Sequence, residues 1–428
     1  MKELPTGLQV FEHIRRSGMV YVDKTDMIHK IVSSGRKQFF ISRPRRFGKT
    51  LLCYTLNALF SGKRELFEGL AISRIDWAWE SYPVIHLDMS KVETAYGIDG
   101  IKKSLVSQIR DIAHEHKVNI SEESLPGDML KRIILDTSEK HGKPAVVIID
   151  EYDGPFLEFY NDPPMVEEVR KVIRSFYSRL KANEPAMRFL FMTGISKFTK
   201  AGVFSKLNNL NDLSMDKNFS TMLGYTEGEL HEYFSDRLEL VARDRNIPVG
   251  ELIDKIERHY NGFCFDGVQK VYCPFSILNF FESGEFLNFW MKSGSTKLIA
   301  DYMRGRSLTV EQFRGMPVSL NFAHDPGEIE SAPPESFLYQ AGYLTLRDRT
   351  GDEFSLDYPN AEVLESMSEL VYKNMINHNG EFVDLRTPLV TALVDGDSDL
   401  VVETIDRLLA GIPYNDYTNA AKQGMRLG

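Results

Sequence analysis

Residues 43–50 read Arg43-Pro44-Arg45-Arg46-Phe47-Gly48-Lys49-Thr50 and follow an apolar run at residues 39–41. This order predicts a strand, a tight loop and a helix over residues 51–60. A loop that closes on Gly-Lys-Thr is typical of a phosphate site. The glycine lets backbone N–H groups approach a phosphate, the lysine reaches the β and γ phosphates, and the threonine hydroxyl binds Mg²⁺. The helix directs the positive end of its dipole at the same anion.

The loop departs from the usual phosphate-binding pattern at one position. That pattern has a glycine five positions before Gly48, where this chain has Arg43. Taken alone, Gly-Lys-Thr after a strand is a weak signal, because an ordinary helix start with a surface lysine explains it equally well. A nucleotide site therefore needs a second motif.

That motif lies at residues 146–151, where four β-branched apolar residues precede Asp150 and Glu151. The pattern predicts a buried parallel strand that carries two carboxylates at its C-terminal edge, where ligands bind in open α/β sheets. Asp150 is the candidate to hold Mg²⁺ through water, and Glu151 the candidate to polarise a water for attack on a γ-phosphate. A core strand ending in a solvated acidic turn is the alternative, which the upstream Gly-Lys-Thr makes less attractive.

A third apolar run, residues 188–192, ends in polar residues. In additional-strand P-loop ATPases, a polar residue that ends the strand between the two motifs senses the γ-phosphate. Thr193 and Ser196 are the candidates for this sensor, and Lys197 and Lys200 for a cationic trigger. An ordinary strand exit explains the same residues about as well.

These motifs and several others resemble one known family. The matching segments are Tyr21-Val22-Asp23-Lys24-Thr25, Arg43 to Leu51, Ile149-Asp150-Glu151-Tyr152-Asp153, Thr193-Gly194-Ile195-Ser196-Lys197, Leu207-Asn208-Asn209-Leu210, Asp212-Leu213-Ser214, Gly224-Tyr225-Thr226, Tyr260-Asn261-Gly262-Phe263, Pro274-Phe275-Ser276, Gly342-Tyr343-Leu344-Thr345 and Tyr358-Pro359-Asn360-Ala361-Glu362-Val363. In them the chain resembles the predicted AAA-ATPase-like proteins of bacteria and archaea, which are similar to the signal-transduction ATPases of the additional-strand class. Arg43 agrees with this family, whereas Cys273 stands where relatives usually have asparagine.

The resemblance implies Mg-dependent binding and hydrolysis of ATP, with the choice of ATP over GTP left open. The residues expected to bind the nucleotide are Arg45, Arg46, Phe47, Gly48, Lys49, Thr50 and Leu51. The metal ligands expected are Thr50 and Asp150, and the catalytic candidates are Glu151, Lys49, Thr193 and Ser196. An arginine finger is also expected, and Arg174, Arg179 and Arg188 are the nearest candidates in sequence.

Alternating strands and helices predict an α/β fold with a doubly wound parallel sheet, here a P-loop NTPase of the additional-strand class. Residues 82–89 supply a further strand, and helices are expected at 98–115 and 126–140. Residues 21–32 lie beside the first strand and either contact the base or pack on the sheet. We expect the ATPase domain to span residues 1–220.

The rest of the chain reads as two smaller units that follow the ATPase. Residues 221–325 predict a helical, winged-helix-like lid, with helices at 230–243, 251–260, 275–282 and 284–292 and a hairpin at 262–272. After a linker at 323–334, residues 335–428 predict a second winged-helix-like and helical segment, with a helix, a hairpin over 343–358 and helices at 364–377, 389–394 and 400–409. Many relatives continue into a nuclease module, but no Asp/Glu-x-Lys closes a strand-like run after Asn360, so nuclease activity is not expected here.

Composition excludes several classes of protein. A net charge of −10 argues against a uniformly nucleic-acid-binding surface, and the basic cluster at Arg36, Lys37, Arg43, Arg45 and Arg46 flanks the phosphate loop, so we expect it to bind the triphosphate. No apolar run is long enough to span a membrane, no signal region is apparent, and three scattered cysteines form no disulfide framework. These features fit a protein of the reducing cytoplasm, and the family resemblance implies a bacterial one.

Three functions are compatible with the sequence. The first is an ATPase whose hydrolysis switches an attached or partner effector, with ATP, a partner protein or nuclease module, and DNA as candidate partners and homo-oligomerisation left open. The second is a slow nucleotide-dependent scaffold or switch. The third is a DNA-binding regulator that uses its winged helices.

Overall fold

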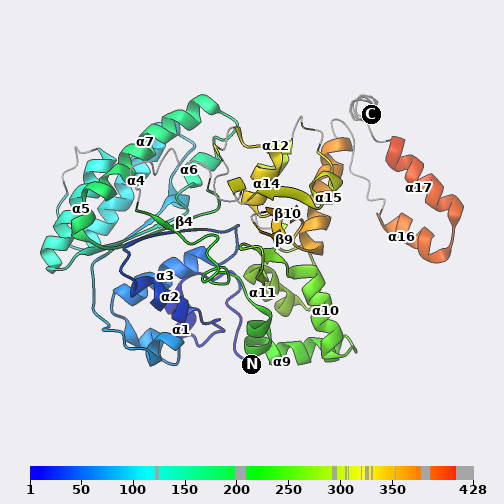
Figure 1. Ribbon diagram of the computed structural model, residues 1–428, viewed down its shortest axis with the longest axis horizontal. Helices are drawn as coiled ribbons and strands as arrows, with labels where there is room; N and C mark the ends of the chain where they lie inside the picture. Colours follow the sequence, from blue (N-terminus) through cyan, green and yellow to red (C-terminus); the bar gives the residue numbers. More distant parts are fainter. Residues whose placement is uncertain are drawn as a thin grey trace.

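The protein is described from a computed structural model (Figure 1). The structure describes residues 1–120, 125–197, 209–291, 296–303, 306, 308–319, 321–322, 327–328, 331–351, 353–376 and 386–410. The expected trigger Lys200, residues 207–208 of the family motifs and much of the expected linker lie outside these residues.

A five-stranded parallel sheet forms the centre of the N-terminal half. Its strands are β1 (Gln38–Ser42), β2 (Val84–Asp88), β3 (Ala145–Asp150), β4 (Met187–Gly194) and β5 (Asn211–Asp212), in the order β2-β3-β4-β1-β5. β4 therefore lies between the phosphate-loop strand and the acidic strand, which confirms the additional-strand class. β2, which confirms the strand expected at 82–89, lies at one edge of the sheet. The central strands are buried on both faces, as their continuous apolar runs predict.

Helices cover both faces of this sheet, with α1–α3 on one side of β4 and α4, α5 and α7 on the other (Figure 1). Their bounds are α1 Phe11–Arg16, α2 Thr25–Val32, α3 Lys49–Phe60, α4 Gly97–Glu115, α5 Pro126–His141, α6 Gly154–Leu157 and α7 Pro163–Ala182. Short 3₁₀ turns lie at Arg64–Phe67, Ala71–Arg74, Met89–Lys91, Glu184–Ala186 and Glu311–Phe313. The helices predicted after residues 50, 97 and 125 are thus confirmed.

A helical unit follows the sheet. It comprises α9 (Glu227–Asp244), α10 (Val249–Tyr260), the hairpin of β6 (Phe263–Cys264) and β7 (Lys270–Val271), and α11 (Pro274–Ser283). Thr226 caps α9 in a capping box with Glu229, as its sequence predicts. The helix predicted at 284–292 is wrong over its described part, because Gly284 ends α11 at φ +70° and Tyr260 Oη is hydrogen-bonded to both backbone groups of Leu287.

A second antiparallel sheet lies in the C-terminal part. It contains β8 (Met316–Ser319), β9 (Thr345–Thr350) and β10 (Glu353–Asp357) in the order β8-β10-β9. Along the chain, α12 (Thr296–Met303) precedes β8, and α14 (Pro334–Ala341) connects β8 to β9. The helices after it are α15 (Ala361–Ile376), α16 (Arg386–Asp395) and α17 (Ser398–Ala410). The predicted helix and hairpin are confirmed, and β8 adds a third strand that the sequence reading missed.

The hydrophobic core does not divide at the boundaries that the sequence predicts. One cluster joins the parallel sheet to residues of the C-terminal half such as Phe263, Trp290 and Leu346. A second cluster holds α9, α10 and α11 together with Val20 and Val22. The division into domains at 1–220, 221–325 and 335–428 thus stays a prediction. Among the described helices, none is long and apolar enough to cross a membrane.

Candidate nucleotide site

The loop between β1 and α3 has the backbone shape of an anion site. Gly48 is the N-cap of α3 and has φ +88°, a left-handed conformation that glycine adopts without strain. Arg46 also has positive φ, +71°, so the turn bends sharply before the helix begins. The first backbone N–H groups of α3 consequently face the space beside this loop, together with the positive end of the helix dipole.

Lys49 is buried at the centre of the loop. Its side chain is 4% exposed, and Nζ donates hydrogen bonds of 3.1 Å to the carbonyl oxygens of Arg43 and Pro44. Burial lowers the pKa of Lys49, and the nearby carboxylates of Glu151 and Asp150 oppose that shift. The loop thus holds an ammonium group in position by its own backbone.

Asp150 and Thr50 supply oxygen ligands suited to Mg²⁺. The Asp150 carboxyl is 1% exposed, and Oδ1 has no hydrogen-bond partner among the described residues. Burial raises the pKa of Asp150 to about 6, while a hydrogen bond from Thr50 and the charge of Lys49 lower it in part. Hard oxygen donors with an unsatisfied buried oxygen fit Mg²⁺, which also takes ligands from a nucleotide.

Glu151 stands next to this pair in a strained backbone conformation. Its φ is +50°, and its carbonyl oxygen accepts a 2.8 Å hydrogen bond from Gly154 N–H. A positive φ at a residue other than glycine is unfavourable and is commonly found at functional sites. Its side chain lines the same cavity as Lys49.

That cavity has a volume of about 390 Å³ and lies between the phosphate loop, the N-terminal segment and α11. Its lining residues are Pro5, Gly7, Leu8, Gln9, Arg45, Arg46, Gly48, Lys49, Thr50, Leu51, Ser90, Glu151, Tyr225, Pro274, Phe275 and Leu278. The sequence reading missed the contribution of residues 5–9 and of α11, since neither carries a phosphate motif. The arginine of this cavity with the clearest contact to α11 is Arg46, whose Cζ lies 4.7 Å from the centre of the Phe275 ring.

Residues 21–25 do not line this cavity, so packing explains them better than base contact. Asp23 Oδ1 accepts hydrogen bonds from the backbone N–H and the hydroxyl of Thr25 within the same turn. Asp23 Oδ2 accepts a hydrogen bond from the more distant Ala71 N–H. Lys24 Nζ donates to Glu229 Oε2 at 2.6 Å and to the Thr221 carbonyl oxygen at 2.8 Å. The segment therefore fastens the start of α9 to the N-terminal half of the chain.

The two sensor candidates lie in different surroundings. The Thr193 hydroxyl is fully buried at the end of β4, opposite Ile41 of β1, and has no hydrogen-bond partner in the part of the chain that the structure describes. Ser196 instead donates its hydroxyl to Asp153 Oδ2 at 2.8 Å. Of the two hydroxyls, that of Thr193 is the one without a partner among the described residues, and Thr193 does not line the cavity beside the loop.

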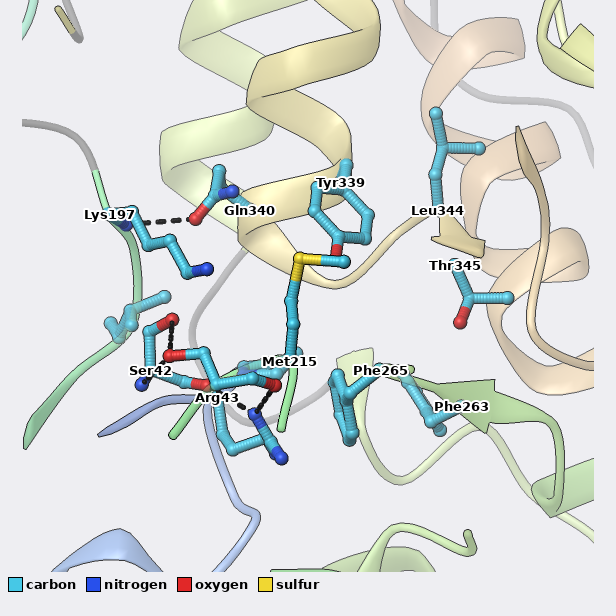
Figure 2. A pocket seen from close by; sticks show the side chains of 13 residues that line it. Ser42, Arg43, Lys197, Met215, Phe263, Phe265, Tyr339, Gln340, Leu344 and Thr345 are labelled. Carbon is cyan, nitrogen blue, oxygen red and sulfur yellow. Dashed lines mark hydrogen bonds between the residues drawn. The ribbon is translucent and has the colours of Figure 1, made fainter. Parts of the chain in front are cut away.

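Arg43 does not face the phosphate cavity. It is 1% exposed, and its Nη1 donates to the carbonyl oxygens of Ser42 and Ser214 at 2.9 and 2.8 Å. Its Cζ lies 3.9 Å from the centre of the Phe265 ring, in a small second cavity between the loop and the C-terminal half (Figure 2). The expectation that the whole basic cluster binds the triphosphate is thus wrong for Arg43, because its guanidinium is used up by backbone carbonyls on the other side of the loop.

Phe47 also points away from the cavity. Its ring is 1% exposed and packs edge-on against Phe263, with 4.8 Å between the ring centres. Only its backbone is thus available to a nucleotide. Of the arginine-finger candidates, Arg179 pairs with Asp128 at 2.8 Å and Arg188 donates to the Val32 carbonyl oxygen, so both have partners within the chain.

Comparison with known proteins agrees with this geometry. Residues 5–204 match the family described as "Predicted AAA-ATPase". The chain belongs to this family. A protein of Azotobacter chroococcum mcd 1, described as "Uncharacterized protein in vnfD 5'region", is 32% identical over 432 residues, which cover 98% of this chain and 79% of that protein.

Two solved structures are similar at a low level. The Orc1 protein of Aeropyrum pernix in complex with DNA is 12% identical with a TM-score of 0.29, over 85% of this chain and 94% of that one. Cdc6p of Pyrobaculum aerophilum is 11% identical with a TM-score of 0.27, over 82% and 92%. Scores this low support no inference about function or domain arrangement.

Proposed function

We propose that the protein binds Mg-ATP in the cavity beside the phosphate loop and hydrolyses it. The observation that carries this proposal is that Lys49, Thr50 and Glu151 line one cavity and the Asp150 carboxyl lies against Thr50. Membership of the predicted AAA-ATPase family supports it. A phosphoryl transfer of this kind needs mainly positioning and charge neutralisation, which such a site provides.

Each residue has a separate role in this mechanism. The ammonium of Lys49 exchanges its two carbonyl partners for β- and γ-phosphate oxygens, and the N–H groups at the start of α3 bind the same anion. Glu151 accepts a hydrogen bond from the attacking water and orients it towards the γ-phosphorus. The Thr193 hydroxyl is the γ-phosphate sensor. Thr50 and, through water, Asp150 would hold a Mg²⁺ ion, which would neutralise phosphate charge.

We further propose that hydrolysis changes the position of the C-terminal half and thereby regulates an attached or partner effector. The contacts that support this link the phosphate loop directly to that half: Trp290 Nε1 donates to the Arg45 carbonyl oxygen at 3.2 Å, and Phe47 packs on Phe263. A slow nucleotide-dependent switch uses the same contacts and differs only in its rate of turnover.

The test is steady-state hydrolysis of Mg-ATP by the wild type, Glu151→Gln and Lys49→Ala. We expect Glu151→Gln to bind Mg-ATP as the wild type does and to lose at least about 100-fold in turnover, and Lys49→Ala to lose binding as well. Equal turnover by wild type and Glu151→Gln would refute the assigned mechanism. If the wild type binds ATP but neither it nor the variants hydrolyse it, the slow switch is favoured. Salt-dependent DNA binding that Lys49→Ala leaves unchanged would instead favour the DNA-binding regulator.

A further inference from the structure

The loop that leaves β4 is fixed to the acidic strand by one buried carboxylate. Asp153 Oδ2 accepts hydrogen bonds of 2.8 Å from both the backbone N–H and the hydroxyl of Ser196. Its two oxygens also accept from Ile195 N–H at 3.2 Å. Asp153 is 1% exposed, so these bonds are shielded from water and hold the two strand ends as one piece.

This junction is tightly packed at Gly194. A Cβ at Gly194 would lie 2.5 Å from the Tyr152 ring and 2.6 Å from Asp153 Oδ1. Tyr152 N–H also donates to the Thr193 carbonyl oxygen at 2.9 Å. A displacement of Thr193 by an arriving or departing γ-phosphate therefore moves the residues that follow it, rather than being absorbed locally.

The next residue of this loop is held from outside the ATPase sheet. Lys197 N–H donates to Gln340 Oε1 at 2.8 Å, and the two residues are 4% and 6% exposed. Figure 2 shows this bond on the wall of the small cavity that also holds Arg43. Gln340 belongs to α14, which precedes the hairpin of β9 and β10.

From these contacts we infer that Gln340 is a positioning residue for ATP hydrolysis, through which α14 holds the γ-phosphate sensor of the ATPase site. The inference rests on the proposed function. A buried N–H without an acceptor is strongly unfavourable, so α14 and the sensor loop keep their bond by moving together. A partner that displaces α14 thereby slows hydrolysis without touching the nucleotide.

The test compares three substitutions of Gln340 in the full chain. Gln340→Met keeps the volume but has no acceptor, Gln340→Asn keeps the amide but withdraws it by one methylene, and Gln340→Glu keeps an acceptor at full length. Glu335→Gln, on the same helix and outside the cavity, is the control. We expect kcat to fall about 2- to 30-fold in Gln340→Met and Gln340→Asn, with KM and ATP affinity within about twofold of wild type, and to recover in Gln340→Glu.

A double-mutant cycle separates this role from ordinary packing. Ser196→Ala and Gln340→Met act on one loop, so we expect their combined effect on kcat to be smaller than the product of the separate effects, whereas Ser196→Ala with Glu335→Gln multiplies. Unchanged kcat in both Gln340→Met and Gln340→Asn, with normal turnover by the wild type, would overturn this inference alone. Failure of the wild type to hydrolyse ATP would overturn the proposed function and the inference with it. If Gln340→Met unfolds below the assay temperature, Gln340→Asn decides.

Discussion

Replacing Arg43 by methionine tests the assignment of this side chain to the interior rather than to the nucleotide. Methionine fills a similar volume but has no donors, so Arg43→Met leaves the carbonyl oxygens of Ser42 and Ser214 without their 2.8–2.9 Å partners. It also removes the guanidinium from the Phe265 ring, 3.9 Å away. Since the side chain is directed away from the cavity that Lys49 lines, ATP affinity should change little.

The expected loss of stability is the balance of two stabilising contributions of Arg43 and one cost of burying it. Each hydrogen bond from a charged donor contributes about 1.5–3 kcal/mol, and a desolvated cation–ring contact about 2 kcal/mol. Against these, burial lowers the pKa of the Arg43 guanidinium to about 10, a desolvation cost of about 3 kcal/mol that methionine does not carry. The net expectation is a loss of about 2–5 kcal/mol, or about 2–6 °C in Tm for a chain of this length.

The assay is thermal unfolding with and without Mg-ATP, together with the Kd for Mg-ATP well below Tm. Arg132→Met is the matched control, because Arg132 is 66% exposed and forms a surface ion pair with Asp136, so its removal should change stability by less than about 1 kcal/mol. A wild-type Tm for Arg43→Met would refute the interior role. A normal Tm with loss of ATP binding would instead restore Arg43 to the triphosphate site.

Two further predictions concern the loop and the acidic strand. Gly342 has φ +89°, and a Cβ there would lie 2.6 Å from Pro44 Cβ, so Gly342→Ala should lower the free energy of unfolding in denaturant by about 1–3 kcal/mol. Gly351→Ala is the control and should cost less, because Gly351 has φ +65° but nothing within 4 Å of its Cβ position. Equal losses in the two variants would contradict the contact with Pro44. Burial raises the pKa of Asp150 from 3.8 to about 6, so the folded chain holds this proton more tightly than the unfolded chain and stability falls as pH rises from about 4 through 6. In the absence of metal and above pH 6, the free energy of unfolding of Asp150→Asn should therefore exceed that of the wild type by up to about 3 kcal/mol, and this difference should vanish near pH 4. A difference that does not depend on pH would contradict the raised pKa.

Local patterns were sufficient for most elements of the fold. Continuous apolar runs mark β1, β3 and β4, and helical periodicity marks α4 and α5, because burial of one face or of both faces dictates those spacings. The position of β4 between β1 and β3 depends on pairing between distant strands, which no local pattern records. β5 has two residues and β8 contains Pro317, so neither reads as a strand alone.

The candidate site divides in the same way. Lys49, Thr50 and Glu151 are marked by motifs, because the chemistry they would perform requires those residue types at those positions in the chain. Arg43 and Gln340 carry no such mark. Arg43 meets Ser214, 171 residues away, and Gln340 meets Lys197, 143 residues away, so only the folded structure assigns their partners.

The arginine in place of the first loop glycine has a physical reason in this fold. A glycine at position 43 would offer no side chain to the C-terminal half, whereas Arg43 anchors the start of the loop under Phe265. The end of the loop is held on the same side, since Phe47 packs on Phe263. Glu362 of α15 also supports this side of the loop, through its hydrogen bond with Trp290.

Through Glu362 the helix α15 also contacts the loop indirectly. Its Oε1 accepts from Trp290 N–H at 2.6 Å and its Oε2 accepts from the Ser276 hydroxyl at 2.8 Å, while Trp290 Nε1 donates to the Arg45 carbonyl oxygen. Burial raises the pKa of Glu362 to about 7, so the exclusion of water from this junction favours the neutral form of its carboxyl group. A phosphate that reshapes the loop must therefore either move α11 and α15 with it or break buried hydrogen bonds. Because the second course is the more costly, we expect the C-terminal half to move in response to a nucleotide bound at the proposed site.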